Sequence, residues 1–470
     1  MPETHEPDSA PTPPAPTLVR GLSTWDGALL TIGSIVGTGI FITTADMAKR
    51  LPHPGLILLV WLAGGLLTLA GALSYGELGA MFPRAGGLYH FVKEAYGPLV
   101  GFLYGWTAFL VIMSGGNAAL GVAFGEYLGS FLPWFSTQHA LVSVPIGHWT
   151  WTLSGGQVAA VAAILILTAI NHFGLKEGAG VQNALTVLKV AAIVGLIAVG
   201  LFARAPVQPH LFGPVGQVPG GLLAAFGVAM IAALWTYDGW YGLTCSAGEM
   251  RDPGRSLPRG LILGTGAVIV LYLLLNVVYA RALSMGAMAA TPRIAETAAS
   301  VLFGPWAARV VSLIVLVSTF GCLSSTILYS SRIYLPMAED GLFFKSLARI
   351  HPVYRTPVPS LWAQTAWSIV LTVSGTYSQL YTYVVFASIV FHAMTAAAVF
   401  IFRFRRPDAP RPYRTWGYPV VPALFILGCL LLIGNTLQES PYESLIGLGL
   451  VALGVPAYVM FRRQSARQNA

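Results

Sequence analysis

Residues 33–41 read GSIVGTGIF and lie near the middle of the first long apolar run of this 470-residue chain. Gly33, Gly37 and Gly39 fall within seven positions, and each glycine costs a helix interior about 1 kcal/mol relative to alanine. Gly33 and Gly37 have the spacing of small residues that let two membrane helices pack closely. Close packing does not require the additional glycine at position 39, directly after Thr38. The pattern therefore favours an unwound segment with free backbone N–H and C=O groups over packing alone.

Residues 235–240, WTYDGW, form a second interruption, in the middle of the sixth apolar run. A mid-span aspartate is costly in a membrane, so Asp238 is a candidate functional residue. Gly239 beside it would permit a break in the helix. Asp238 could instead cap the N-terminus of a half-helix. The two roles are compatible, because a discontinuous helix needs both a break and a cap.

The composition is that of a membrane protein: 55% of the residues are hydrophobic and 9% are charged, whereas soluble domains average about 25% charged residues. So few charges cannot cover a water-exposed surface, and lipid must therefore solvate most of the outside. Twelve apolar runs approach or exceed the ~20 residues that span a bilayer. They cover residues 25–48, 55–81, 98–132, 155–173, 180–203, 220–247, 260–283, 303–337, 359–375, 378–402, 418–437 and 442–461. We therefore predict an all-α membrane protein with twelve transmembrane helices.

The distribution of lysine and arginine predicts the orientation, because cytoplasmic loops carry an excess of both. If the N-terminus is cytoplasmic, 19 of the 26 basic residues lie on the inner side, 6 on the outer side and one, Lys189, within the fifth run. Both termini are thus expected in the cytoplasm, and residues 1–20, with six prolines, are expected to form a disordered tail. The net charge of +8 then reflects orientation in the lipid bilayer and implies no nucleic-acid partner. At the inner end of the second run, Glu77 and Arg84 are placed to pair.

Lys189 lies several residues inside the predicted membrane boundary of the fifth run. Its long side chain could reach back to the inner surface, with the ammonium in water. Alternatively, Lys189 is a cation built into the helix bundle, where a coupling ion could otherwise sit.

The two interrupted runs, the first and the sixth, are five helices apart. That spacing is expected if helices one to five and six to ten form two inverted repeats, an arrangement in which many transporters bind substrate between two broken helices. Half-helix N-termini would attract a carboxylate and exposed carbonyls an ammonium, and a zwitterionic amino acid offers both groups. The expected division is residues 21–203 and 204–402 for the repeats, 403–462 for two further helices and 463–470 for a C-terminal cytoplasmic tail.

Motifs for catalysis or nucleotide binding are absent from the sequence: it has no GxxxxGK[ST], no HExxH and no GxSxG with plausible partners. Cys245, Cys322 and Cys429 lie in apolar runs, without metal spacing or a disulfide pattern. We therefore expect no enzyme activity, no cofactor and no metal.

Several short motifs together resemble the amino acid–polyamine–organocation superfamily, and within it the L-type branch of bacterial exchangers and light subunits of heteromeric transporters. The resemblance covers roughly residues 21–462. The motifs are GTGIF at 37–41, YGELG at 75–79, FPRAGG at 82–87, YDGW at 237–240, EM at 249–250, SSR at 330–332, PYR at 412–414 and GYP at 417–419. Each is weak alone, but their order and spacing are specific.

The resemblance implies a LeuT-type fold, with two inverted five-helix repeats and two extra helices. It also implies where the substrate carboxylate binds: at the backbone N–H groups of Gly37, Thr38 and Gly39, in the break of the first helix.

The substrate amino group would meet backbone carbonyls in both breaks, which by the resemblance are those of Ile35, Trp235 and Asp238. Tyr237 and Gly239 complete the substrate-binding set. Trp235 matches an aromatic residue that, in the family, gates the site from outside.

Lys189 matches a lysine that takes the place of a sodium site in the family, which implies sodium-independent transport, commonly by exchange. Many L-type members have glycine where this chain has Asp238, and this departure leaves side-chain selectivity open. In the family, light subunits carry a cysteine in the outer loop between helices three and four that bonds a heavy subunit. The matching residues 133–154 contain no cysteine, so the resemblance implies no disulfide-linked heavy subunit. The chain therefore resembles a stand-alone protein of a prokaryotic plasma membrane.

The expected function is sodium-independent exchange of small to medium neutral L-amino acids. Proton-coupled symport is a second possibility, with Asp238, Lys189 or His392 in the proton relay. Cationic amino acids or polyamines could also be accepted at Asp238. An amino acid sensor that does not transport is an alternative of a different class.

Overall fold

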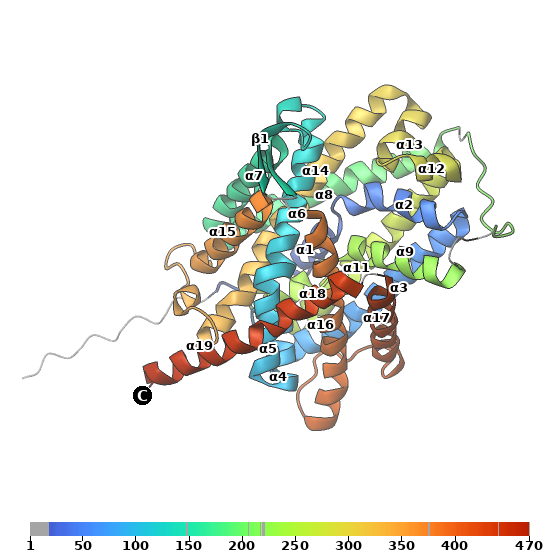
Figure 1. Ribbon diagram of the computed structural model, residues 1–470. Coiled ribbons are helices and arrows are strands. Elements are labelled where there is room, and N and C mark those ends of the chain that lie inside the picture. Colours follow the sequence, from blue (N-terminus) through green and yellow to red (C-terminus); the bar gives the residue numbers. More distant parts are fainter. Residues whose placement is uncertain are drawn as a thin grey trace, which may run out of the picture.

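The computed structural model describes residues 18–469, except 147–148, 205, 217, 219–220, 375–376 and 440. Most of the tail predicted at residues 1–20 lies outside these residues. The described chain is a bundle of helices with one small β-hairpin (Figure 1). The hairpin and α13 (Ile294–Phe303) lie toward one end of the bundle, and α4 (Leu88–Tyr96) lies toward the other. We refer to them as the hairpin end and the α4 end.

Nine helical segments of the described chain are long and apolar enough to cross a membrane, and a bent pair of helices makes a tenth. The nine segments are built from α3 (Pro54–Met81), α5 (Pro98–Thr107) with η1 (Ala108–Ile112) and α6 (Met113–Gly129), α7 (Gly155–His172), α8 (Leu175–Phe202), α11 (Pro253–Ala282), α14 (Pro305–Glu339), α16 (Tyr377–Arg405), α17 (Val420–Glu439), and α18 (Pro441–Ala452) with α19 (Gly454–Asn469). The chain is therefore a helical membrane protein. Two of the twelve predicted runs are represented by shorter helices, α9 (Leu222–Tyr237) with 16 residues and α15 (Val358–Ser374) with 17.

The bent pair consists of α1 (Thr24–Ile35) and α2 (Gly39–Arg50), whose axes differ by 43°. Ser23 and Asp26 form a capping box that starts α1. Three residues, 36–38, separate the two helices, so the first run is interrupted where its glycines predicted. Helix α1 packs against α8, α11 and α14, which places this interruption inside the bundle.

The second interruption follows α9. Asp238 ends that helix with an extended backbone, and Gly239 has φ +91°. The chain then forms α10 (Gly242–Cys245) and the short η3 (Ala247–Glu249). A Cβ atom on Gly239 would lie 2.7 Å from the backbone oxygen of Ser34. Glycine at this position therefore allows both a left-handed backbone and direct contact between the two interruptions.

The third apolar run is not a regular α-helix throughout, because η1 is a π-helical segment of 5 residues. Such segments are rare and frequently lie at functional sites. The hairpin, β1 (Ala140–Ile146) and β2 (Trp149–Ser154), is antiparallel and was not predicted from the sequence. The remaining short elements are η2 (Pro133–Phe135), α12 (Met285–Ala290) and η4 (Lys345–Ala348).

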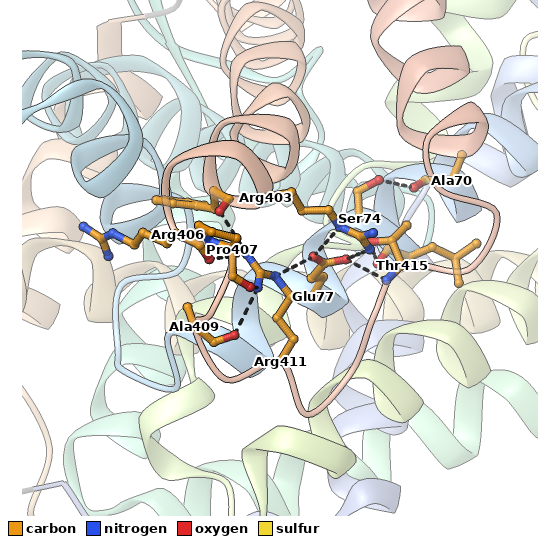
Figure 2. Close-up of polar contacts among 11 residues, drawn as sticks. Ala70, Ser74, Glu77, Arg403, Arg406, Pro407, Ala409, Arg411 and Thr415 are labelled. Atoms are coloured by element: carbon orange, nitrogen blue, oxygen red, sulfur yellow. Dashed lines mark hydrogen bonds and ion pairs between the residues drawn. The ribbon is translucent and has the colours of Figure 1, made fainter.

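Glu77 of α3 does not pair with Arg84, so that expectation was wrong. Arg84 follows the end of α3 and is exposed. The buried carboxylate of Glu77 instead accepts hydrogen bonds from Nε and Nη2 of Arg403, at 3.0 and 2.7 Å, and from the backbone N–H of Thr415, at 2.7 Å. Figure 2 shows these groups converging on Glu77, with Arg411 Nε 3.4 Å away. The network ties the connection between α16 and α17 to α3.

Candidate functional site

A cavity lies between the two interruptions, and we call it the central cavity. The first interruption contributes Ser34, Ile35, Gly37, Thr38 and Gly39, and the second contributes Trp235, Thr236, Asp238, Gly239 and Tyr241. The other walls are Ile112, Met113, Gly116 and Leu120 from η1 and α6, and Cys322, Thr326 and Tyr329 from α14. The space between these atoms, part of it open to solvent, is about 590 Å³.

The start of α2 presents free hydrogen-bond donors to this cavity. Within the described part of the chain, none of the backbone N–H groups of Gly37, Thr38 and Gly39 donates to another residue. The Thr38 side chain does not cap the helix either. A helix N-terminus carries a partial positive charge and unsatisfied N–H groups, so this wall is suited to bind a carboxylate.

The carbonyl groups of the first interruption are largely occupied by side chains from neighbouring helices. The hydroxyl of Tyr272 donates to Ile35 O at 3.1 Å and to Thr236 O at 3.3 Å, and so links both interruptions. Cys322 Sγ donates to Ser34 O at 3.0 Å. Each carbonyl oxygen retains a second lone pair, so Ile35 O can still accept a bond from a bound ammonium.

Lys189 lies behind the first interruption and does not line the central cavity. Its ammonium donates to Gly33 O and Val36 O at 2.7 Å each, and the residue is fully buried. A side chain in that position does not reach the membrane surface, so the snorkelling alternative is excluded. Ser318 Oγ adds bonds of 3.1 Å to Val36 O and 3.3 Å to Gly37 O. The positive charge thus lies at the C-terminal end of α1, where a cation is favoured.

Tyr237 belongs to the predicted binding set but does not line the cavity. Its ring packs edge-on against Trp61, with centroids 5.8 Å apart, and its hydroxyl donates to Trp61 O at 3.1 Å. Tyr237 is therefore a packing residue in this structure, whereas the other predicted residues of both interruptions meet at the cavity.

Asp238 lines the central cavity and also a second cavity behind α9, which we call the side cavity. Its side chain is 29% exposed, and its Oδ1 lies 3.9 Å from His392 Nε2. His392 Nδ1 lies 2.9 Å from the hydroxyl of Tyr75. The residue that precedes α10, Tyr241, makes no side-chain cap, and Asp238 makes no capping bond to α10 in the described chain. The carboxylate is therefore available to ligands in both cavities.

A sequence model of a family described as amino acid permease matches residues 22–451. The chain belongs to the amino acid permease family. Its relatives within this family come from bacteria and animals. The Serine/threonine exchanger SteT of Bacillus subtilis (strain 168) is 31% identical over 440 residues, which is 93% of this chain and 95% of the relative.

Two human transporters are also similar. Large neutral amino acids transporter small subunit 2 of Homo sapiens is 30% identical over 435 residues, covering 91% of this chain and 78% of the relative. Cystine/glutamate transporter of Homo sapiens is 27% identical over 445 residues, covering 95% of this chain and 84% of the relative.

Several residues that shape the site of this permease were not predicted from the sequence. Tyr272 is one aromatic residue within a long apolar run, and only the fold brings its hydroxyl to both interruptions. No sequence pattern distinguishes Cys322 and Thr326 from the other residues of the eighth run. Among the hydroxyl residues of α14, Thr319 and Ser325 bond their own helix at i−4, whereas Ser318 reaches the interruption. Among the described residues, no three His, Cys, Asp or Glu side chains come together as metal ligands.

Proposed function

We propose that the protein is a sodium-independent exchanger of small to medium neutral L-amino acids, working by alternating access. The observation that carries this proposal is the central cavity, which combines unpaired N–H groups at Gly37, Thr38 and Gly39 with carbonyl oxygens such as Ile35 O. The donors suit an α-carboxylate and the acceptors suit an α-ammonium. The names of its relatives, which include a serine/threonine exchanger, support the same substrate class.

The proposed architecture is a LeuT-type fold with twelve transmembrane helices. Residues 21–203 and 204–402 form the two inverted repeats, and 403–462 form the two further helices. This division is supported by the position of the two interruptions, α1–α2 and α9–α10, at corresponding places in the two halves. The excess of Lys and Arg in the predicted inner segments supports cytoplasmic termini in a prokaryotic plasma membrane, with the α4 end inside and the hairpin end outside.

Lys189 supports the proposal of sodium independence. Its ammonium occupies the carbonyls of Gly33 and Val36, which would otherwise be oxygen ligands for a cation. A fixed positive charge there supplies hydrogen bonds to the carbonyl groups at the C-terminal end of α1 and repels a second cation. The carbonyls stay occupied without any ion from solution.

Proton-coupled symport is the second candidate, and the contact between Asp238 and His392 favours it. These two side chains lie 3.9 Å apart beside the central cavity. His392 Nδ1 is in turn hydrogen-bonded to the hydroxyl of Tyr75. A proton could pass along such a chain. The same carboxylate could also accept the side chain of a cationic amino acid or a polyamine.

Uptake of a radiolabelled amino acid panel into proteoliposomes, without sodium, separates these possibilities. Uptake that requires unlabelled amino acid inside would support exchange. Uptake into empty vesicles that increases with an inward proton gradient would support symport instead. No uptake under either condition would reject both transport mechanisms for the panel and favour a sensor or a different substrate.

A further inference from the structure

The hairpin end contains a third cavity, which we call the outer cavity. It is lined by Thr38 and Ile42 of α2, Glu126 and Tyr127 of α6, Gln138 of the loop before the hairpin, and Arg293 before α13, together with neighbouring small residues. Thr38 also lines the central cavity, so the two cavities meet at this residue. The outer cavity has about 1060 Å³ of space, part of it open to solvent. The outer cavity is thus large enough for a small solute and lies beside a residue that also lines the central cavity.

Arg293 is the positive group of the outer cavity, and its guanidinium is loosely paired. Nη2 lies 3.6 Å from Glu126 Oε1, and Nη1 lies 3.6 Å from Glu296 Oε2. Both distances exceed the roughly 2.7–3.2 Å of an N–H···O hydrogen bond. The guanidinium also lies 5.0 Å from the centre of the Tyr127 ring. In the described chain the Arg293 side chain makes no hydrogen bond of normal length, and it interacts with Glu296 only at this longer distance, although arginine has five N–H donors.

The two carboxylates beside Arg293 differ in their exposure. The Glu126 side chain is 53% exposed and that of Glu296 is 13% exposed. Glu296 lies behind Arg293 and accepts a hydrogen bond from Ser312 Oγ. Burial raises the pKa of the Glu296 carboxyl, although the bond from Ser312 and the charge of Arg293 act to lower it. The cavity itself thus presents one accessible charge of each sign, Arg293 and Glu126, on two different elements.

A surface ion pair at the other end of α2 shows that this loose arrangement is not general. Lys49 and Asp46 are both exposed and make a direct contact of 2.7 Å. Glu126 and Arg293 are less exposed, yet they stay 3.6 Å apart. Their donors and acceptors are therefore available to a ligand with one group of each charge.

We propose that the outer cavity is a second binding site for a zwitterionic α-amino acid, in which Arg293 binds the carboxylate and Glu126 binds the ammonium. A carboxylate can take two parallel N–H···O bonds from one guanidinium, and such charge-assisted bonds are stronger than neutral ones. The identity of the ligand rests on the proposed function, but the site does not depend on whether transport is exchange or symport. An amino acid held there would lie beside Thr38, which also lines the central cavity.

Equilibrium binding of tritiated L-serine to the purified full-length protein tests the proposal. The wild-type protein is expected to bind two molecules per chain. Arg293→Gln and Glu126→Gln are expected to bind one, and to raise the apparent KM for exchange by roughly tenfold, as expected for losing a hydrogen bond to a charged group. Arg309→Gln, which removes an exposed arginine near the start of α14 that does not line the cavity, is the control and should match wild type. Arg293→Lys keeps the positive charge but cannot make the two parallel bonds of a guanidinium. Its apparent KM should therefore lie between those of wild type and Arg293→Gln.

One bound molecule per wild-type chain, with equal apparent KM in Arg293→Gln and Arg309→Gln, would overturn the outer site. A change in maximal rate without a change in stoichiometry would also overturn it, because it would show that the Arg293–Glu126 contact only holds α13 against α6. Glu126 is half exposed, so its variant is expected to fold even if Arg293→Gln does not. Exchange in the proteoliposome assay is measured in parallel. Loss of exchange for every amino acid in the wild type would reject the proposed function, whereas exchange with a single bound molecule would reject only the outer site.

Discussion

The guanidinium of Arg332 and the carboxylate of Glu249 form a bidentate ion pair, with Nε–Oε2 and Nη2–Oε1 distances of 2.9 Å each. Both side chains are buried. The backbone oxygen of Glu249 also accepts the N–H groups of Gly21 and Leu22, at 2.8 and 2.9 Å. The pair thus connects α14, η3 and the segment before α1 at the end of the bundle opposite the hairpin.

Glu249→Ala is expected to lower the stability of the protein strongly. Removing one partner of a buried ion pair costs about 3–5 kcal/mol, because the other charge stays buried without compensation. The melting temperature of the purified protein in detergent measures the effect. Glu94→Ala is a suitable control, since the Glu94–Arg406 pair is exposed and such pairs contribute about 0–1 kcal/mol.

The double variant Glu249→Leu/Arg332→Met distinguishes an ion pair from a general packing effect. Replacing both charges by apolar groups is often neutral or stabilising, so this variant should recover most of the lost melting temperature. Equal losses in the single and double variants would show that shape, rather than charge, is what these side chains contribute.

Lys189→Ala is expected to reduce exchange by at least about tenfold, because a hydrogen bond to a charged group contributes ~1.5–3 kcal/mol and 1.4 kcal/mol corresponds to tenfold. The variant removes both bonds of the ammonium to Gly33 O and Val36 O. Ser318 still donates to Val36 O, so the fold should be largely retained. Initial exchange rates in proteoliposomes, normalised to incorporated protein, provide the measurement. Leu188→Ala, at the exposed neighbouring position on α8, is the control, and wild-type rates in Lys189→Ala would contradict the role assigned to this charge.

The parts of this fold that follow from local composition could be predicted from the sequence. Apolar runs and charge bias reveal the spans, and the glycines around Gly37 and the pair Asp238–Gly239 mark the interruptions, because each signal lies within a few consecutive residues. Residues whose role depends on rotation about a helix axis could not be predicted. Tyr237 and Asp238 are adjacent in sequence, but one packs on Trp61 and the other lines the cavity.

Contacts between distant segments were also beyond sequence reasoning. Tyr272 meets Ile35 across 237 positions of the chain, and no periodicity of α11 distinguishes it from other buried tyrosines. Sequence proximity pairs Glu77 with Arg84, yet its partner Arg403 is 326 positions away. In both cases packing of helices, rather than local pattern, selects the partner.

Two glycines of the interruptions should respond differently to alanine. Gly239→Ala places a Cβ 2.7 Å from Ser34 O at φ +91°, so we expect loss of folded protein or of exchange. Gly37→Ala meets Cys322 Sγ at 3.3 Å, which a side chain can accommodate, so the protein should fold. The added methyl group would narrow the central cavity and weaken transport of larger substrates more than that of small ones.

Size-exclusion yield, melting temperature and exchange of a small and a large neutral amino acid measure these effects. Gly434→Ala, with no atom within 4 Å of the new Cβ, is the control and should behave as wild type. Normal folding and exchange in Gly239→Ala would show that the contact between the two interruptions is not required.

Asp238→Asn is expected to change substrate selectivity. The Asp238 carboxylate faces both the central and the side cavity and lies 3.9 Å from His392 Nε2. An ionised group at this position attracts a cationic side chain and disfavours an anionic one, and an amide removes that preference while keeping the shape. If a substrate cation bonds to Asp238, its affinity should fall by about 10–100-fold, since such a bond contributes ~1.5–3 kcal/mol. Neutral substrates should change much less.

Inhibition of labelled exchange by a panel of neutral, cationic and anionic amino acids measures that profile. His392→Gln is the matched variant, because it removes the titratable neighbour while leaving the Asp238 carboxylate in place. Asp238→Asn should lose the preference for cationic over anionic substrates, whereas His392→Gln, which keeps the carboxylate, should retain it. An unchanged inhibition profile in Asp238→Asn would show that this carboxylate does not interact with the substrate side chain, although it lines two cavities. Selectivity would then have to come from other residues that line the central cavity, such as Met113 of α6 and Thr326 of α14.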